Sequence, residues 1–191
     1  MRRVVEALVV GTFGRCIALA ARLGHRASTA QQLARCTRLG EGVEGGRYLV
    51  IEGAGTIALA QAVRLSDRVR LSTYPGGSIH VGARSFLGTD VCIAAGTGTV
   101  TIGEDCLIAE QVSIRASNHG MRAGTPMRLQ PNLVRDITIG NDVWIGKGVT
   151  ITAGSVVASG CVIGANSVVR GETEPNTIYA GVPIQKIRGR T

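Results

Sequence analysis

An aliphatic residue recurs every six positions over most of this chain, and this period restricts the fold more than any other feature. The series starts at residue 51, slips by three residues near Gly98, and breaks over roughly residues 118–136. Its members are Ile51, Ile57, Val63, Val69, Pro75 (which keeps the register), Val81, Leu87, Ile93, Ile102, Ile108, Ile114, Ile139, Ile145, Ile151, Val157, Ile163 and Val169. A fixed short period is typical of repeat proteins, in which each unit is buried only by stacking on its neighbours.

Two further positions of each six-residue unit are restricted. Gly or Ala follows the aliphatic residue at positions 82, 88, 94, 103, 109, 140, 146, 158 and 164. Small or β-branched residues lie four positions after it, at Ser85, Val91, Cys106, Val112, Val143, Val149, Ser155, Cys161 and Ser167. We interpret each unit as a short strand plus a tight corner, with three units per triangular coil. Coils stacked at ~4.8 Å would pair through parallel hydrogen bonds, which predicts an all-β parallel β-helix.

The composition agrees with such a core. The chain has 191 residues and 27 Gly, and aromatic residues make up only 3%, although 45% of the residues are hydrophobic. Small aliphatic residues therefore have to fill the interior, and Gly permits the corners. We expect a short helical or irregular segment over residues 1–48, the β-helix over 49–175 with an extended loop at 118–136, and a C-terminal tail over 176–191.

The net charge of +8 suggests an anionic partner, such as nucleic acid, a membrane surface or a phosphorylated ligand. Nucleic acid is excluded as a partner, because no nucleic-acid motif occurs and few aromatic residues are available for stacking. The N-terminus is basic and then apolar, but Glu6, Arg15 and Arg22 interrupt it, so a membrane span or a signal peptide is disfavoured. An amphipathic helix that packs on the body, or rests on a membrane, is expected instead.

Five cysteines, at positions 16, 36, 92, 106 and 161, form no CxxC pair and no zinc-binding spacing. Their odd number argues against a disulfide framework. Cys92, Cys106 and Cys161 fall at regular places in the repeat, where a thiol would act as a small apolar filler. Reduced thiols predict a cytoplasmic protein, which could lie at the inner face of the membrane.

The segment IGNDVWIGKGVTITAGSVVASGCVIGANSVVRGETEPNTIYAGVPIQKIR, residues 139–188, resembles the hexapeptide-repeat acyltransferases. The resemblance is closest to the galactoside, maltose and xenobiotic acetyltransferase branch, through VWIG and AGVP-x-x-x-I-R. With the SNHG motif before it, the resemblance covers about residues 79–188. Within that branch, the chain looks most like the small O-acetyltransferases of surface-polysaccharide pathways. The resemblance implies a left-handed helix, acetyl-CoA as the donor, and a homotrimer in which the loop 118–136 reaches a neighbouring subunit.

Acyl transfer to a hydroxyl needs a base, and it needs hydrogen-bond donors for the oxyanion that forms at the thioester. His119 lies where the repeat breaks into the loop, and the resemblance makes it the general base. The resemblance also places Trp144 beside the acyl-transfer site and assigns the oxyanion contact to the backbone N–H of Lys147. His25 and His80 are interpreted as ordinary packing or surface residues.

The remaining site residues are implied by the same resemblance. The pantetheine arm of coenzyme A would pass Gly146, Lys147 and Ala165. Its phosphates would lie near a C-terminal group of positions, where two residues depart from the usual basic pattern. That group comprises Arg170, Gly171, Gln185, Lys186 and Arg188, with Gly171 and Gln185 as the departures. Thr89, Asp90 and Asn118 are candidates for contacting the acceptor, and no metal site is expected.

The favoured function is therefore direct transfer of acetyl from acetyl-CoA to a hydroxyl of a sugar, in the modification of surface polysaccharide or another glycoconjugate. Four alternatives stay open. They are an N-acyltransferase of an amino-sugar nucleotide, an acetyltransferase of antibiotics, a non-catalytic β-helix scaffold, and a zinc carbonic anhydrase on the same fold. The last would need three converging histidines, and the spacing of His25, His80 and His119 offers no close pair.

Overall fold

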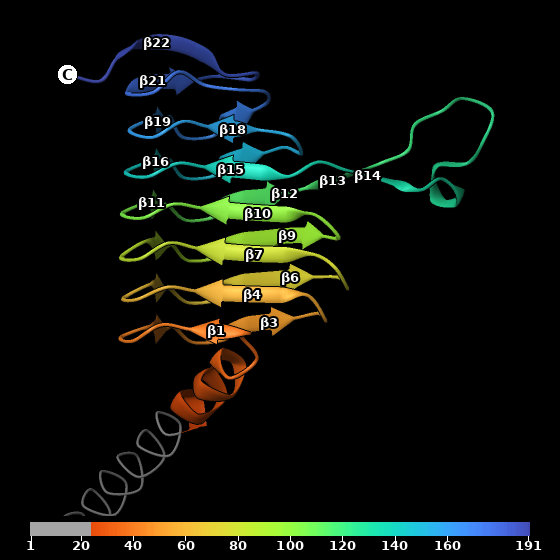
Figure 1. The fold of residues 1–191 in the computed structure, drawn as a ribbon. Helices are drawn as coiled ribbons and strands as arrows, with labels where there is room; N and C mark the ends of the chain where they lie inside the picture. Colours follow the sequence, from red (N-terminus) through yellow and green to blue (C-terminus); the bar gives the residue numbers. More distant parts are fainter. Residues whose placement is uncertain (1–23) are drawn as a thin grey trace, which may run out of the picture.

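The computed structural model describes residues 24–191, and it is a stack of triangular coils. Three sheets form the faces of the stack, and each of six coils contributes one strand to each face. The chain rises from one coil to the next as a left-handed parallel β-helix, which confirms the predicted fold class (Figure 1). Within residues 38–191, an arm projects sideways from the stack between the fourth and fifth coils.

The sheets are called A, B and C in the order in which each coil visits them. Sheet A contains β1 (Arg38–Leu39), β4 (Thr56–Leu59), β7 (Ser78–Val81), β10 (Thr99–Ile102), β15 (Ile137–Ile139) and β18 (Val156–Val157). Sheet B contains β2 (Glu44–Gly45), β5 (Arg64–Leu65), β8 (Phe86–Leu87), β11 (Leu107–Ile108), β16 (Trp144–Ile145), β19 (Val162–Ile163), β21 (Thr177–Ala180) and β22 (Gln185–Gly189). Sheet C contains β3 (Val50–Glu52), β6 (Arg70–Thr73), β9 (Cys92–Gly96), β12 (Ser113–Arg115), β17 (Thr150–Ile151) and β20 (Val168–Val169). The arm is a two-stranded antiparallel ribbon of β13 (Ser117–His119) and β14 (Asn132–Val134), with a 3-10 turn at Met127–Leu129.

The core is a set of aliphatic columns, one along the inside of each sheet. From Val81 onward these columns contain the residues of the six-residue series, and all of them are buried. Before Val81 the predicted register is correct at Ile51, which pairs with Leu71 in the column of Ile93, but it is wrong at Ile57, Val63 and Val69. Leu59 is the residue that pairs with Val81, and Leu65 pairs with Leu87. The C–A corners of the first three coils contain additional residues, so a strict count of six runs through them and loses the register.

The corners repeat the same backbone conformation at every level. At the B–C corner, residues with positive φ angles stack as Tyr48, Arg68, Asp90, Gln111, Gly148 and Asn166. A left-handed conformation costs roughly 1–2 kcal/mol for a residue with a Cβ atom. Each backbone N–H from Arg68 upward offsets part of this cost by donating to a carbonyl on the coil below, as Asn166 does to Lys147 at 2.8 Å. The ladder holds the corner side chains outward in straight columns.

Both open ends of the stack are covered. Residues 24–33 form a helix whose Leu33 packs into the core under the first coil. The Gln32 side chain accepts a hydrogen bond from the backbone N–H of Ile51 at 2.8 Å, which satisfies a group on the exposed strand edge. At the other end, β22 turns back antiparallel to β21. These covers matter because an unpaired strand edge is a template for aggregation.

The cysteines only partly follow their prediction. All four within the described residues are free, and Cys106 and Cys161 are buried fillers as expected. Burial raises the pKa of Cys106, and it raises the pKa of Cys36 to about 11. Cys92 differs, because its side chain points outward from β9 between Arg70 and Ser113 on the neighbouring strands. The outward position follows from alternation along the strand, since the next residue, Ile93, points inward.

We expect Gly103→Val to destabilise the fold by about 1–3 kcal/mol, the usual cost of overpacking. A Cβ at Gly103 would lie 2.6 Å from the backbone of Gly140 on the next coil, where nothing can move without separating two strands. Gly189→Val is the matched control, because a Cβ there meets nothing within 4 Å. Thermal melts of the two variants test this, and equal melting temperatures would contradict it.

Candidate active site

A hollow of about 610 Å³ lies where the arm leaves the stack, on the C–A edge of the first four coils. The arm forms its upper wall, and outward residues of sheet C form its floor. The lining residues are Glu52, Gly53, Ser72, Thr73, Tyr74, Ala94, Gly96, Arg115, Ser117, Asn118, His119 and Asn132. Two of the predicted site residues, Asn118 and His119, are therefore neighbours in this hollow, and both are exposed to solvent.

The arm is held by its own hydrogen bonds. Strand β13 pairs with β14 so that His119 faces Asn132. Beyond them, the side chain of Gln130 accepts from the backbone N–H of Arg122 at 2.8 Å and donates to the carbonyls of Arg122 and Thr125. These bonds fix the base of the loop and therefore the position of His119. The outer part of the arm exposes large apolar side chains, 52–70% accessible, at Met121, Met127, Leu129 and Leu133.

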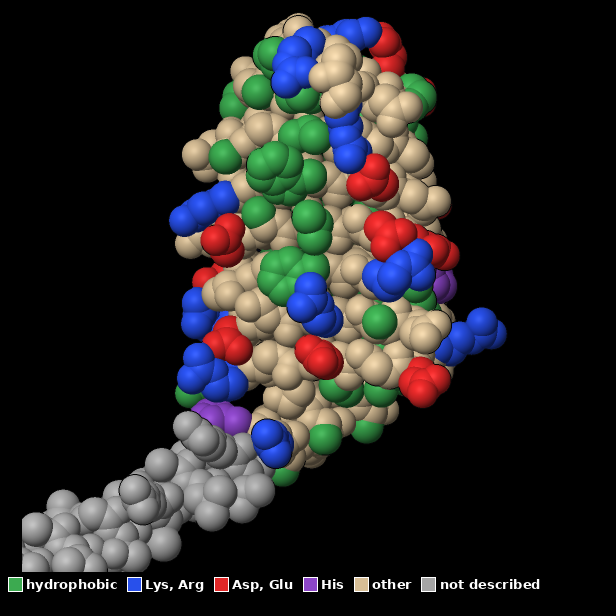
Figure 2. All heavy atoms as spheres, turned by 90° about the vertical axis from the view of Figure 1, so that its left-hand side faces the viewer, with side chains coloured by type: hydrophobic (Ala, Val, Ile, Leu, Met, Phe, Trp, Pro, Cys, Tyr) green, Lys and Arg blue, Asp and Glu red, His purple; other side chains and the backbone are tan. Residues whose placement is uncertain are grey.

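A second hollow, of about 440 Å³, lies on the face of sheet B. Outward side chains of three stacked strands form it, because Phe86, Leu107 and Trp144 pair in one register. Figure 2 shows this face, with hydrophobic side chains running up its middle. Trp144 is 54% exposed, so it is a surface residue as predicted. Thr89 lines the same hollow.

Within one chain the predicted catalytic residues are not brought together. His119 lies in the hollow at the C–A edge, whereas Trp144 lies on sheet B. Asp90, a candidate for binding the acceptor, already has a charged partner in the same chain. Its carboxylate accepts a hydrogen bond from the Arg68 guanidinium at 2.7 Å, and this contact lowers the pKa of Asp90. The single chain thus presents two separate halves of the predicted site.

The residues predicted to hold the pantetheine arm lie together at the B–C corner of the upper coils. A Cβ at Gly146 would come 2.7 Å from the backbone nitrogen of Ala165 on the next coil, so the two coils approach closely at this corner. Lys147 occupies the same corner, and its carbonyl accepts from Asn166. No hydrogen bond within residues 24–191 uses the backbone N–H of Lys147, so this donor is available to a ligand.

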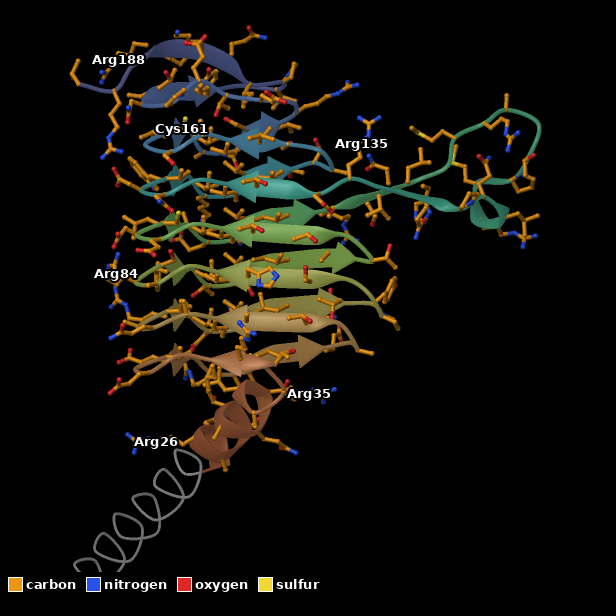
Figure 3. The ribbon with its side chains drawn as sticks, in the orientation of Figure 1. Arg26, Arg35, Arg84, Arg135, Cys161 and Arg188 are labelled. Carbon is orange, nitrogen blue, oxygen red and sulfur yellow. The ribbon has the colours of Figure 1, made fainter. Side chains whose placement is uncertain are left out.

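The candidate phosphate contacts are divided between two faces. Arg170 and Gly171 follow β20 on sheet C, whereas Gln185, Lys186 and Arg188 belong to β22 on sheet B. Lys186 is paired with the carboxylate of Glu174, and this contact raises its pKa. Arg188 lies at the upper end of the stack, on the side opposite the arm (Figure 3), and its guanidinium donates only to the carbonyl of Gly189 within the described residues.

The three histidines lie far apart in the architecture. His25 is in the helix and packs edge-to-face on Tyr48, His80 is on β7 of sheet A, and His119 is in the arm. Within residues 24–191, no group of three His, Cys, Asp or Glu side chains is arranged to hold a metal ion. In the same range, no helix has the length and hydrophobicity needed to span a bilayer. The proposed amphipathic segment at the N-terminus lies outside the described residues.

Comparison with known proteins follows the repeat. The family profile described as bacterial transferase hexapeptide (six repeats) matches residues 136–171. The chain is also 35% identical over 146 residues to WbbJ of Escherichia coli (strain K12), covering 72% of this chain and 74% of WbbJ. The chain belongs to the hexapeptide-repeat acyltransferases. The name of WbbJ assigns it provisionally to O-acetyl transfer in lipopolysaccharide biosynthesis.

Solved structures support the fold of this acyltransferase. AntD, an N-acyltransferase from Bacillus cereus determined with dTDP and 3-hydroxybutyryl-CoA, superposes with a TM-score of 0.72 at 22% identity, over 82% of this chain and 84% of AntD. A maltose O-acetyltransferase from Clostridium difficile 630 gives a TM-score of 0.58 at 22% identity, over 81% of this chain and 70% of the other. These likenesses establish the architecture of the acyltransferase.

Apart from Asn118 and His119, the residues that line the hollow were not predicted as site residues, and Arg115 and Tyr74 are the largest of those missed. Arg115 and Tyr74 both line it, Arg115 from β12 and Tyr74 from a C–A corner. A signal for Arg115 was present in the sequence, because residues 115, 117 and 119 alternate along an extended segment and share one face with the predicted base. Tyr74 carried no such signal, since the C–A corners have no fixed length.

Proposed function

We propose that this acyltransferase moves an acetyl group from acetyl-CoA to a hydroxyl of a sugar, in the modification of surface polysaccharide or another glycoconjugate. The observation that carries the proposal is the position of His119, which lies in a solvent-open hollow of about 610 Å³ and whose side chain has no hydrogen-bond partner within the described residues. The relation to WbbJ supports a sugar hydroxyl as the acceptor.

In this mechanism His119 takes the proton of the acceptor hydroxyl while its oxygen attacks the thioester carbonyl. The backbone N–H of Lys147, which has no hydrogen-bond partner among residues 24–191, donates to the oxyanion of the tetrahedral intermediate. Collapse of the intermediate breaks the carbon–sulfur bond. The protonated His119 then returns its proton to the leaving thiolate, so no covalent acyl-enzyme forms.

The donor is proposed to lie along the corner formed by Gly146, Lys147 and Ala165, with its phosphates toward the C-terminal end of the stack. Arg188 is the better placed phosphate contact on β22, because Lys186 already has a carboxylate partner. Arg170 and Gly171 reach the donor only if its phosphates extend around the stack to sheet C. A guanidinium suits this role, since its fork matches the oxygens of a phosphate.

We further propose that the active form is a homotrimer. His119 and Trp144 occupy different sides of one chain, so a complete site needs the arm of one subunit and the corner of another. The exposed methionines and leucines of the arm would be covered by that contact. Closed cyclic symmetry is the general expectation when one surface patch binds a different patch of an identical chain.

The experiment for the proposed function is a thiol-release assay with acetyl-CoA and a panel of sugars, sugar nucleotides and aminoglycosides. We expect release of coenzyme A to depend on a sugar acceptor and the product to be an ester. Hydroxylamine cleaves an ester and spares an amide, so it separates O-transfer from N-transfer. An amide product would favour the N-acyltransferase alternative, and an absence of acetyl-CoA binding would favour the scaffold.

A further inference from the structure

Arg115 differs from three arginines at corners of the stack, Arg47, Arg68 and Arg84. Each of these pairs with a carboxylate on an adjacent coil, as Arg68 does with Asp90 at 2.7 Å and Arg84 does with Asp105 at 2.7 Å. The guanidinium of Arg115 has no hydrogen bond or ion pair within residues 24–191, and it is exposed to solvent. Its charge is therefore available to a ligand.

The column of residues below Arg115 explains why it has no partner. Arg115 pairs with Ala94 on the coil below, Ala94 pairs with Ser72, and Ser72 pairs with Glu52. The first carboxylate in this column is thus three coils away, about 14 Å at the usual strand spacing. Glu52 is also occupied, because it accepts from Arg70 at 3.2 Å. The two residues between are small, so the column forms a trough with a cation at one end.

Arg115 and His119 share this trough. Strand alternation places residues 115, 117 and 119 on the same side of the chain, and all three line the hollow, whereas Ala116 is buried. At about 3.3 Å per residue, the Cα atoms of Arg115 and His119 are at most ~13 Å apart. Between them lies Ser117, above Gly96, where an added Cβ would come 3.7 Å from the Ser117 hydroxyl. The floor between the cation and the base is therefore made of small residues.

We propose that Arg115 binds an anionic group, a carboxylate or a phosphate, on the same sugar whose hydroxyl His119 deprotonates. The sugar would lie over Ser117 with its anion toward Arg115 and its reacting hydroxyl toward His119. Among the residues that line the hollow, Arg115 alone has a Lys or Arg side chain. Its planar guanidinium can bind either a carboxylate or a phosphate through two hydrogen bonds. The preferred acceptor is therefore an acidic or phosphorylated sugar, and this inference rests on the proposed function.

The test compares matched acceptors in the thiol-release assay: glucose, galactose and mannose, their uronic acids, and their 6-phosphates. Charge-assisted hydrogen bonds contribute enough to predict that one anionic series exceeds its neutral parent by roughly 10- to 100-fold in kcat/KM. The series that gains identifies the anion as carboxylate or phosphate. Added salt should reduce the preference, because an exposed charge pair is screened.

Arg115→Ala should lower kcat/KM for the anionic sugars by that factor of roughly 10 to 100 and for the neutral sugars by much less, so that the preference is lost. Arg115→Lys should keep part of it, because a lysine retains the charge without the fork. Arg26→Ala is the matched control: it removes the same charge from the exposed helix at the other end of the molecule (Figure 3) and should change neither rate. Equal losses with neutral and anionic sugars in Arg115→Ala would overturn the proposal, as would a wild-type preference for neutral sugars.

Binding measured without turnover separates this inference from the proposed function. Saturation-transfer NMR with the same uronic acids and 6-phosphates should detect contact with the wild-type protein and a loss of that contact in Arg115→Ala. If the anionic sugars bind in this way and no thiol is released, the proposed function fails, and only the anion-binding role of Arg115 stands. If neutral sugars are acetylated and the anionic ones do not bind, the proposed function stands and the inference fails.

Discussion

Replacement of His119 by alanine is expected to lower turnover by about 10²–10⁴-fold, the usual contribution of a positioned general base. Acetyl-CoA affinity should remain near that of the wild type, because the proposed donor contacts are made by Gly146, Lys147 and Ala165 and not by the His119 side chain. Stability should also be unchanged, since His119 is exposed and its side chain makes no hydrogen bond within the described residues.

Three measurements check this expectation: the steady-state rate of thiol release, acetyl-CoA binding by calorimetry, and a thermal melt. His80→Ala is the matched control, because His80 lies on sheet A outside the hollow and should be replaced without loss of turnover. Near-normal activity in His119→Ala would remove the base from the mechanism. A trapped acyl-enzyme would contradict direct transfer.

Two inactive variants are expected to restore activity to each other when their subunits exchange. In His119→Ala the base is missing, and in Ala165→Phe a bulky ring should block the proposed donor edge, where the native side chain is small and exposed. If each site combines the arm of one chain with the corner of another, random mixing in equal amounts leaves about one quarter of the sites with both halves intact. Activity should therefore recover from nearly zero to about a quarter of the wild-type value.

Light scattering provides the accompanying measurement. Three chains of 19.9 kDa give an expected mass of about 60 kDa. Exchange must be demonstrated with differently tagged chains before the assay is interpreted. A fully active monomer would contradict the trimer, and mixed trimers without recovered activity would indicate that each site lies within one chain.

The sequence predicted the architecture because a six-residue period leaves few alternatives, and the motifs SNHG and VWIG marked both halves of the candidate site. The predicted register of the inward residues was wrong in the early coils, where additional residues at the C–A corners interrupt the six-residue period. Val63 and Val69 were placed in the main aliphatic series, yet they are the inward corner residues that precede Leu65 and Leu71. They are buried all the same, so burial alone could not reveal the slip.

The electrostatic role of the corner residues was not predictable either. Asp90 was a candidate for acceptor binding because it lies one coil before the arm, and its partner Arg68 is 22 residues earlier. That separation reflects a C–A corner of irregular length, so no fixed spacing in the sequence marks the pair. C–A corners of irregular length also contribute residues to the hollow, and Tyr74 lies in one of them, so no fixed spacing in the sequence marked it. Arg115 could have been found, because it shares the alternating face of residues 115, 117 and 119.

The corner residues with positive φ angles stack at every level, so the β-helix can be lengthened or shortened only by whole coils. A segment inserted into a strand or a B–C corner would shift the corner residues above it out of column, whereas a complete turn, or additional residues at a C–A corner, leaves the columns aligned. The distance from Arg115 down the trough to Glu52 can therefore change only in increments of one strand spacing, about 4.8 Å. Relatives with more or fewer turns below the arm would therefore have troughs whose lengths differ in steps of that size.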